Sequence, residues 1–430
     1  MSVLNSNNAP DASVVKPHFV FGSIALLVLS AMIILADSNL LEAYFNTKIL
    51  AITHMAVLGW ATMIVFGALY QLIPVVFETS LYSEKLAKLT FWIFGFSILF
   101  LTYAFWVGSF SGLLIYASLL TFSALFLFVI NVILSYRNSK KKNISSKFII
   151  TAIIWLAATE FVGTLIALNF KYIFLTETHL FYLKIHATIG LIGWFLLLII
   201  GVGSTLIPMF LVSHQLNEKK LKIAYILINV GLLGLSLNWF LVNYTVIAPL
   251  FWLAIAVGVL FFFSFVFEAY NKRIRKKLDI GMKHTLISML SVFLPIVISL
   301  IVMMGFGMEE KFLIRVTTLY GFTVIFGFIT TLILGQTYKT LPFVIWLDKY
   351  KGLVGKTKTP MPRELYSENI AKGQFYLYLL FIVCMILGLI FNNIVMIRIG
   401  SYTLLIVAIL YNINVFKIVF HTVKIIKNEE

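Results

Sequence analysis

Twelve long apolar runs make up most of this 430-residue chain and restrict its fold more than any other feature. A run of about 20 apolar residues is long enough to cross the roughly 30 Å hydrocarbon core of a bilayer as a helix. The stretch 113–134 is apolar on nearly every side, whereas the strands of a membrane barrel alternate apolar with polar residues. We therefore predict an all-α membrane protein with twelve transmembrane helices. The predicted spans are 19–36, 49–77, 87–107, 112–136, 149–169, 182–212, 222–243, 246–270, 285–307, 312–345, 371–392 and 395–420.

The composition excludes several other classes of protein. Hydrophobic residues make up 61% of the chain and charged residues 12%, so there are too few charges to cover a soluble globule of this size. The net charge of +16 comes from basic residues clustered between apolar runs, as in 137–147 and 272–283, and not from a stripe interleaved with aromatic side chains. This pattern indicates a lipid bilayer as partner and no nucleic acid. The single cysteine, Cys384, excludes a disulfide scaffold and paired-thiol chemistry within the chain.

The basic residues also predict the orientation in the membrane. Lysine and arginine gather in the loops after the even-numbered spans, whereas opposite loops such as 37–48 hold few basic residues and include Asp37 and Glu42. Because basic loops stay in the cytoplasm, both termini are expected inside. The first sixteen residues lack the basic start and cleavage site of a signal peptide, so the first span is expected to stay as an anchor. We expect a multi-pass protein of a bacterial-type cytoplasmic (inner) membrane.

One motif occurs three times at constant spacing and predicts an internal repeat. A Gly-Trp or Gly-Phe pair is followed by a second Gly and then by a Pro, and each position recurs after 134 residues. The three copies are Gly59, Trp60, Gly67 and Pro74; Gly193, Trp194, Gly201 and Pro208; and Gly327, Phe328, Gly335 and Pro342. We predict a single membrane domain, 1–430, of three pseudo-symmetric four-helix units at about 19–136, 149–270 and 285–420. Close helix packing alone is the alternative explanation for the glycines.

The twelve helices and their threefold repeat resemble subunit I of the haem-copper oxidase superfamily, in particular its divergent cbb3-like members. The residues that carry the resemblance are HMAVLGW from His54 to Trp60, GALYQLIP at 67–74, and KIHATIG at 184–190. The architecture covers nearly the whole chain, whereas the motifs cover only the second helix of each unit. The resemblance implies haem b as cofactor and His54 as an axial ligand of a low-spin haem. It also makes His186 a candidate metal ligand.

Depth in the membrane separates the histidines. His54 lies roughly 8 Å into the second span at 1.5 Å per residue, where a buried imidazole needs a partner. Gly59 and Gly67 are expected to leave room for a flat macrocycle beside the same helix. The alternative is a structural histidine bonded to a neighbouring hydroxyl or carbonyl. Four others are placed at cytoplasmic helix ends, where solvation or capping is expected: His18, His214, His284 and His421.

The chain departs from the oxidase pattern at several ligand positions. The second unit has Thr188 where a histidine next to His186 would be favoured. The tenth helix, 314–342, has no histidine, and the seventh, 221–243, lacks the His-His pair that holds copper in the oxidases. Copper binding is therefore in doubt, because amide, phenol and phenyl groups do not replace imidazole as copper ligands. A second axial haem ligand would have to come from Met303, Met304 or Met308.

Two charged residues in the spans are further candidates. Glu160 lies near the middle of the fifth span, where an ionised carboxylate is costly. It is either a proton-relay residue or a protonated side chain bonded to a neighbouring helix. Arg315 lies near the start of the tenth span. Its guanidinium either meets a haem propionate, as arginines in the oxidases do, or reaches the interface by snorkelling.

These features predict a haem-binding integral membrane protein linked to respiratory electron transfer or to handling of oxygen or nitric oxide, with a degenerate copper centre. Expected partners are a c-type cytochrome or other respiratory subunits. Two alternatives stay open: a non-catalytic protein of haem or copper trafficking, sensing or respiratory-complex assembly, and a proton-coupled transporter. Whether the chain is an enzyme also stays open, because most copper-centre histidines are absent.

Cysteine labelling tests the topology that the loop charges predict. In a Cys384→Ser background, cysteines introduced at Asn46 and Glu309 should react with a membrane-impermeant reagent added outside. Cysteines introduced at Ser139 and Lys276 should react only when the cytoplasmic side is opened. Labelling of position 139 from outside would overturn every depth assignment above.

Overall fold

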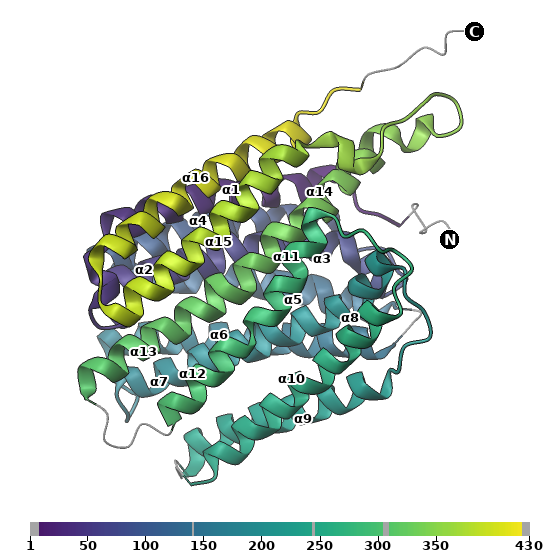
Figure 1. The fold of residues 1–430 in the computed structure, drawn as a ribbon. Coiled ribbons are helices and arrows are strands. Elements are labelled where there is room, and N and C mark those ends of the chain that lie inside the picture. Colours follow the sequence, from purple (N-terminus) through teal and green to yellow (C-terminus); the bar gives the residue numbers. More distant parts are fainter. Residues whose placement is uncertain (1–7, 140–141, 243–245, 304–308, 424–430) are drawn as a thin grey trace. The chain divides into compact units, whose positions relative to one another are not determined.

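The computed structural model describes residues 8–139, 142–242, 246–303 and 309–423, which form helices and no strand (Figure 1). Twelve of these helices are long and apolar enough to cross a membrane, so the prediction of an all-helical membrane protein is confirmed. The spans agree with prediction to within a few residues at most ends. The first begins earlier than expected, at Ala12 and not at residue 19, because the Asp11 side chain caps it by accepting a hydrogen bond from the Ser13 amide at 2.8 Å.

The chain divides into two compact units, which are described separately. Unit 1 is built on Leu72–Phe100 and Ser109–Lys277. Unit 2 is built on Pro10–Gln71, Leu101–Gly108 and the described residues from Leu278 onward. The predicted single domain of three repeat units stays a prediction.

Unit 1 is a set of helices joined mostly by short loops, in which neighbours along the chain pack together. The hairpins of α5 with α6 and of α9 with α10 are examples (Figure 1). The elements are α4 (Glu84–Val107, whose end belongs to unit 2), α5 (Leu113–Arg137), α6 (Ile144–Tyr172), α7 (His179–Thr188), η3 (Ile189–Leu196), α8 (Leu197–Leu211), α9 (Lys219–Leu237), η4 (Asn238–Val242) and α10 (Ala248–Asn271).

Unit 2 combines the first helices of the chain with the last. Helix α1 packs against α16, and α15 and α16 form a hairpin, yellow-green to yellow in Figure 1. The elements are α1 (Ala12–Leu35), η1 (Ser38–Leu41), α2 (Thr47–His54), η2 (Met55–Thr62), α3 (Met63–Val76, whose end belongs to unit 1), α11 (Ile280–Ser291), α12 (Phe293–Met303), α13 (Glu310–Phe322), η5 (Thr323–Thr330), α14 (Thr331–Tyr350), η6 (Lys351–Leu353), η7 (Pro362–Leu365), α15 (Glu368–Phe391) and α16 (Ile394–Val419).

The helix that carries each copy of the repeated motif widens into π-helical geometry for eight residues. The segments η2, η3 and η5 begin 134 residues apart, and each contains the Gly-Trp or Gly-Phe pair at the same two positions. At the end of two of them a threonine hydroxyl donates to the carbonyl five residues earlier: Thr62, the last residue of η2, to Val57 at 2.7 Å, and Thr331, directly after η5, to Phe326 at 3.0 Å. Because π turns are rare and concentrate at functional sites, their recurrence supports a repeat of these helices.

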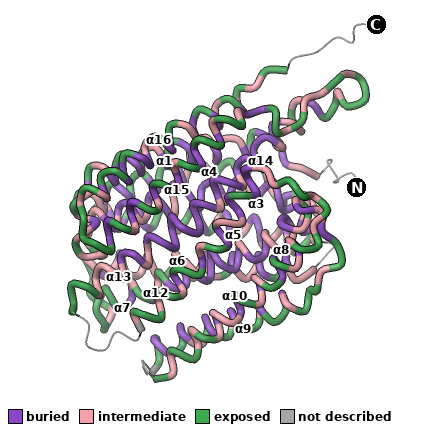
Figure 2. Tube along the Cα trace, in the orientation of Figure 1, coloured by how far each residue is buried: buried purple, intermediate pink, exposed green. Residues whose placement is uncertain are grey.

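The second glycine of each motif lies against the first helix of its predicted unit. A Cβ on Gly67 would lie 2.7 Å from the Cβ of His18, and one on Gly201 would lie 2.9 Å from the Cβ of Phe148. Gly335 faces His284 still more closely. Helices are buried along one side and exposed along the other, as Figure 2 shows by colour. The glycines thus mark close backbone approach on the buried sides.

Replacing Gly335 with alanine should lower the thermal unfolding temperature in detergent, because its Cβ would collide with His284 and with the Gly281 carbonyl. Overpacking of this kind costs about 1–3 kcal/mol. Gly373, exposed on α15 with nothing within 4 Å of an added Cβ, provides the matched control, since alanine there should leave stability unchanged or raise it. Equal melting of the two variants would contradict the packing described here.

Candidate functional site

His54 is the last residue of α2 and lies directly before the π segment η2. The ring is half-buried, and its Nδ1 lies 2.8 Å from the carbonyl oxygen of Leu50. A carbonyl oxygen only accepts, so Nδ1 donates, and in the neutral ring Nε2 keeps the lone pair. The ring also stacks on Phe105, with centroids 4.5 Å apart. A histidine held through one nitrogen by a backbone carbonyl is the usual arrangement of a metal-ligating imidazole.

His186 on α7 is held in the same way by a different helix. Its Nδ1 donates to the carbonyl oxygen of Thr159 on α6 at 3.0 Å. The ring lies against Gly163, where an added Cβ would be 2.7 Å from Cε1 of the imidazole. The absence of a side chain at Gly163 therefore lets His186 reach the backbone of α6.

Glu160 lies on the same stretch of α6, one residue after Thr159, so unit 1 brings Glu160 and His186 to one region. The carboxyl group is half-buried and makes no hydrogen bond or ion pair with any residue that the structure describes. The alternative of a carboxyl bonded to a neighbouring helix is thus not what the structure contains. The role of Glu160 as a proton relay stays a prediction.

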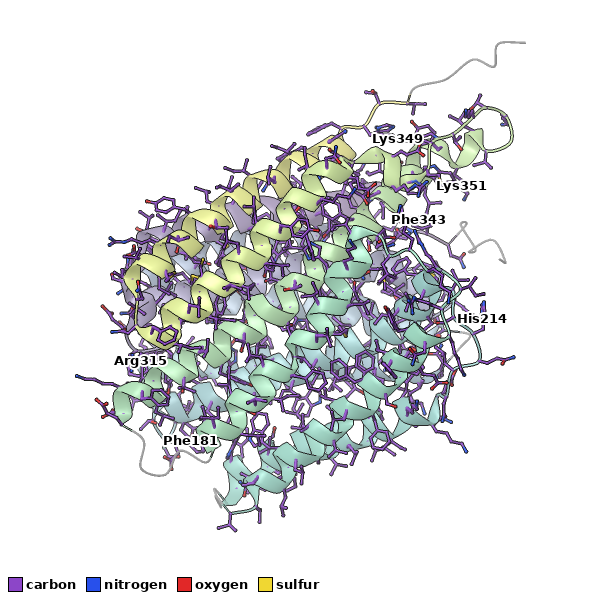
Figure 3. All side chains as sticks on the ribbon, viewed as in Figure 1. Phe181, His214, Arg315, Phe343, Lys349 and Lys351 are labelled. Carbon is purple, nitrogen blue, oxygen red and sulfur yellow. The ribbon has the colours of Figure 1, made fainter. Side chains whose placement is uncertain are left out.

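Arg315 lies in the second turn of α13 in unit 2 and is half-buried. Figure 3 labels it near the end of the unit where α13 begins, far from Lys349 and Lys351 at the end of α14. No ion pair joins it to a described residue, and its contact with a haem propionate stays a prediction. Phe322 ends α13 directly before η5, the position that His54 holds before η2. A phenyl group supplies no metal ligand, so the third motif helix offers none at this point.

Two expectations about the space around these residues need correction. Gly59 is buried in η2, and the room expected beside it stays a prediction. The room expected beside Gly67 is filled by His18. His18 and His284 are fully buried in the protein, so the solvation expected for them is wrong, although both lie within two turns of the start of their helices, α1 and α11.

The remaining histidines do lie near the ends of helices. His214 is exposed in the loop after α8, at the position labelled in Figure 3. His421, just after α16, lies 2.7 Å from the Tyr350 hydroxyl. His179 begins α7, stacked on Phe170 and close to the Asn169 amide.

No protein-family model matches the sequence, and a search of curated proteins finds no match. Among solved structures, the chain is similar to a haem-copper terminal oxidase dimer determined by cryo-electron microscopy. The TM-score is 0.66 at 11% sequence identity, over 96% of this chain and 85% of the other. The chain has a haem-copper oxidase-like fold. The fold resemblance inferred from the motifs is thereby confirmed.

The metal-ligating side chains of this haem-copper oxidase-like fold fit the binding of a haem iron better than that of a copper ion. His54 has the carbonyl support and the lone pair that iron ligation needs. Among the described residues, no three His, Cys, Asp or Glu side chains come together as a metal site. The alternative axial ligands Met304 and Met308 lie outside the described residues, as does the side chain of Met303.

Proposed function

We propose that this chain is a haem-binding integral membrane protein linked to respiratory electron transfer or to the handling of oxygen or nitric oxide, with a degenerate copper centre. The observation that carries the proposal is the orientation of His54, whose Nδ1 donates to Leu50 directly before the π segment η2. The haem-copper oxidase-like fold of the chain also supports the proposal.

In this proposal the residues of unit 2 hold haem b and set its environment. His54 would bind the iron through Nε2, and the hydrogen bond to Leu50 would fix the tautomer and raise the basicity of the ring. The half-buried guanidinium of Arg315 would pair with a propionate. A bound haem would supply one-electron transfer or gas binding at this position. His186 remains a candidate ligand in unit 1, and its Nδ1 is held in the same manner.

The proposed setting is a bacterial-type cytoplasmic membrane with both termini inside, and the proposed partners are a c-type cytochrome or other respiratory subunits. The second candidate function is non-catalytic haem or copper trafficking, sensing or complex assembly. It is favoured by the lack of a three-ligand metal cluster among the described residues. Proton-coupled transport would use Glu160, whose carboxyl group is half-buried in α6.

The visible absorption spectrum tests the haem proposal. Purified wild-type protein should show a Soret band of b type, and His54→Ala should remove or strongly alter it, because the axial ligand is lost. His214→Ala is the matched control: this histidine is exposed in a loop, so its loss should leave the spectrum intact. Identical spectra for wild type and His54→Ala would disprove the assignment, and absence of a Soret band would favour a metal-free function.

Metal analysis and oxygen consumption test the copper centre. We expect substoichiometric copper and little or no oxygen uptake with reduced donors, since His186 alone does not hold copper at the site where the oxidases use three histidines. Stoichiometric copper, together with oxygen turnover that His186→Ala abolishes, would show that the chain has a working active site.

A further inference from the structure

A polar cavity of about 300 Å³ lies in unit 1, at a place where four helices start or end. Helices α6 and α9 begin beside it, and α8 and α10 end beside it. Three serines, two amide side chains, one imidazole and one carboxylate line it together with apolar side chains. Because the same helix ends are the ends of candidate membrane spans, the cavity lies at the depth of lipid headgroups. Its volume is at the lower end of the range for small-molecule sites, roughly 300–1,000 Å³.

The buried part of the cavity accepts hydrogen bonds and does not donate them. Ser145 on α6 and Ser204 on α8 both line the cavity, and each is 7% exposed. Their hydroxyl oxygens lie 2.7 Å apart, and the Ser204 hydroxyl donates to the Gly201 carbonyl at 2.8 Å. A hydroxyl has one proton, so Ser145 is the donor in the serine pair. Both hydroxyls are therefore left with lone pairs and no free proton.

Glu218 adds a negative charge to the lining of the cavity. It is the N-cap residue of α9, yet its side chain makes no capping hydrogen bond, and it forms no ion pair with a described residue. Hydroxyl lone pairs and an unpaired carboxylate both favour a ligand that brings N–H donors and a positive charge. A primary ammonium group has both properties.

The loop that closes the cavity has a backbone conformation that is fixed by its surroundings. Val212 and Gln215, on either side of the segment that carries His214, each have a φ of 54°, which is strained for a residue with a side chain and most of all for valine. The Ile274 amide donates to the Val212 carbonyl at 3.3 Å, and Lys272 Nζ donates to the Gln215 carbonyl at 2.7 Å. Strained conformations that neighbouring contacts hold in place concentrate at ligand-binding sites.

We propose that this cavity binds the headgroup of a phospholipid that carries a primary ammonium, as in phosphatidylethanolamine. The ammonium donates to the hydroxyl oxygens of Ser145 and Ser204, and the carboxylate of Glu218 balances its charge. The phosphate lies at the mouth, where Lys142 and Lys219 are exposed next to lining residues.

The helix ends around the cavity also suit a headgroup with both charges. The starts of α6 and α9 carry positive partial charge, which favours the phosphate, and the ends of α8 and α10 carry negative partial charge, which favours the ammonium. A choline headgroup has the same net charge but no N–H donor, so it does not satisfy the serine hydroxyls. The site lies in unit 1 and does not depend on haem binding.

Lipid titration of the delipidated, full-length protein in detergent tests the proposal by native mass spectrometry. Dioleoyl phosphatidylethanolamine and dioleoyl phosphatidylcholine have the same chains and the same phosphate and differ only in the N–H donors of the headgroup. One molecule of the ethanolamine lipid should bind about tenfold more tightly than the choline lipid, because charge-assisted hydrogen bonds are lost with choline. Equal binding of the two lipids would overturn the proposal.

Two variants connect this preference to the cavity. Glu218→Gln and Ser145→Ala should each weaken binding of the ethanolamine lipid several-fold and leave the choline lipid unaffected. Glu177→Gln is the matched control, because Glu177 is an exposed carboxylate in the loop between α6 and α7, at the opposite end of α6 from the cavity. An equal loss of preference in Glu177→Gln and Glu218→Gln would place the binding elsewhere and contradict the proposal.

O-Phosphoethanolamine, which has the same headgroup but no acyl chains, distinguishes a lipid from a soluble amine. At equal concentration it should leave the melting temperature of the delipidated protein unchanged, whereas phosphatidylethanolamine should raise it, because a ligand stabilises the folded state that binds it. Equal stabilisation by both compounds would identify a soluble amine as the ligand and overturn the lipid assignment.

Discussion

The hydrocarbon core of a bilayer contains no water for backbone groups, and this one constraint explains most of the structure. Every N–H and C=O in the spans must be paired within its own helix, which is why the described residues form helices and no strand. Local departures from α-helical geometry must be satisfied too. Thr62 in η2 and Thr331 directly after η5 each supply a hydroxyl to a π-segment carbonyl five residues earlier. Unusual backbone geometry therefore occurs where side chains support it.

Glycine contacts between first and second helices determine where the histidines lie. Gly67 and Gly335 admit His18 and His284 between packed helices, and Gly163 lets His186 lie on the backbone of α6. Two of these rings then find a carbonyl within reach: Val14 for His18 at 2.8 Å, and Thr159 for His186 at 3.0 Å. The hydrogen bond of His18 lies within its own helix, whereas that of His186 reaches a second helix because Gly163 has no side chain.

A haem-copper oxidase-like fold does not by itself specify oxidase chemistry, because the chemistry depends on which metal-ligating side chains the fold carries. The motif helices keep their π segments in register, yet the residue before each segment is His54, Thr188 or Phe322. Only the first of these offers a lone pair suited to iron. The π segments therefore keep their register while the residues before them differ, and the proposed haem binding is for this reason separate from oxygen reduction.

The sequence by itself determined the class of fold, the number of spans and the fold resemblance. The length and continuity of an apolar run are local properties, and they decide whether the run can cross a bilayer. It also placed His54 and Glu160 within spans. Tertiary structure decided which polar atoms meet. The basic residues that flank His284 in sequence predict solvation, but helices distant along the chain bury its ring, and Gly67 faces His18 and not open space. Burial and hydrogen bonding depend on which helices pack together. A hydropathy pattern shows only whether each helix is apolar enough for lipid, so it carries no information about which helices are its neighbours.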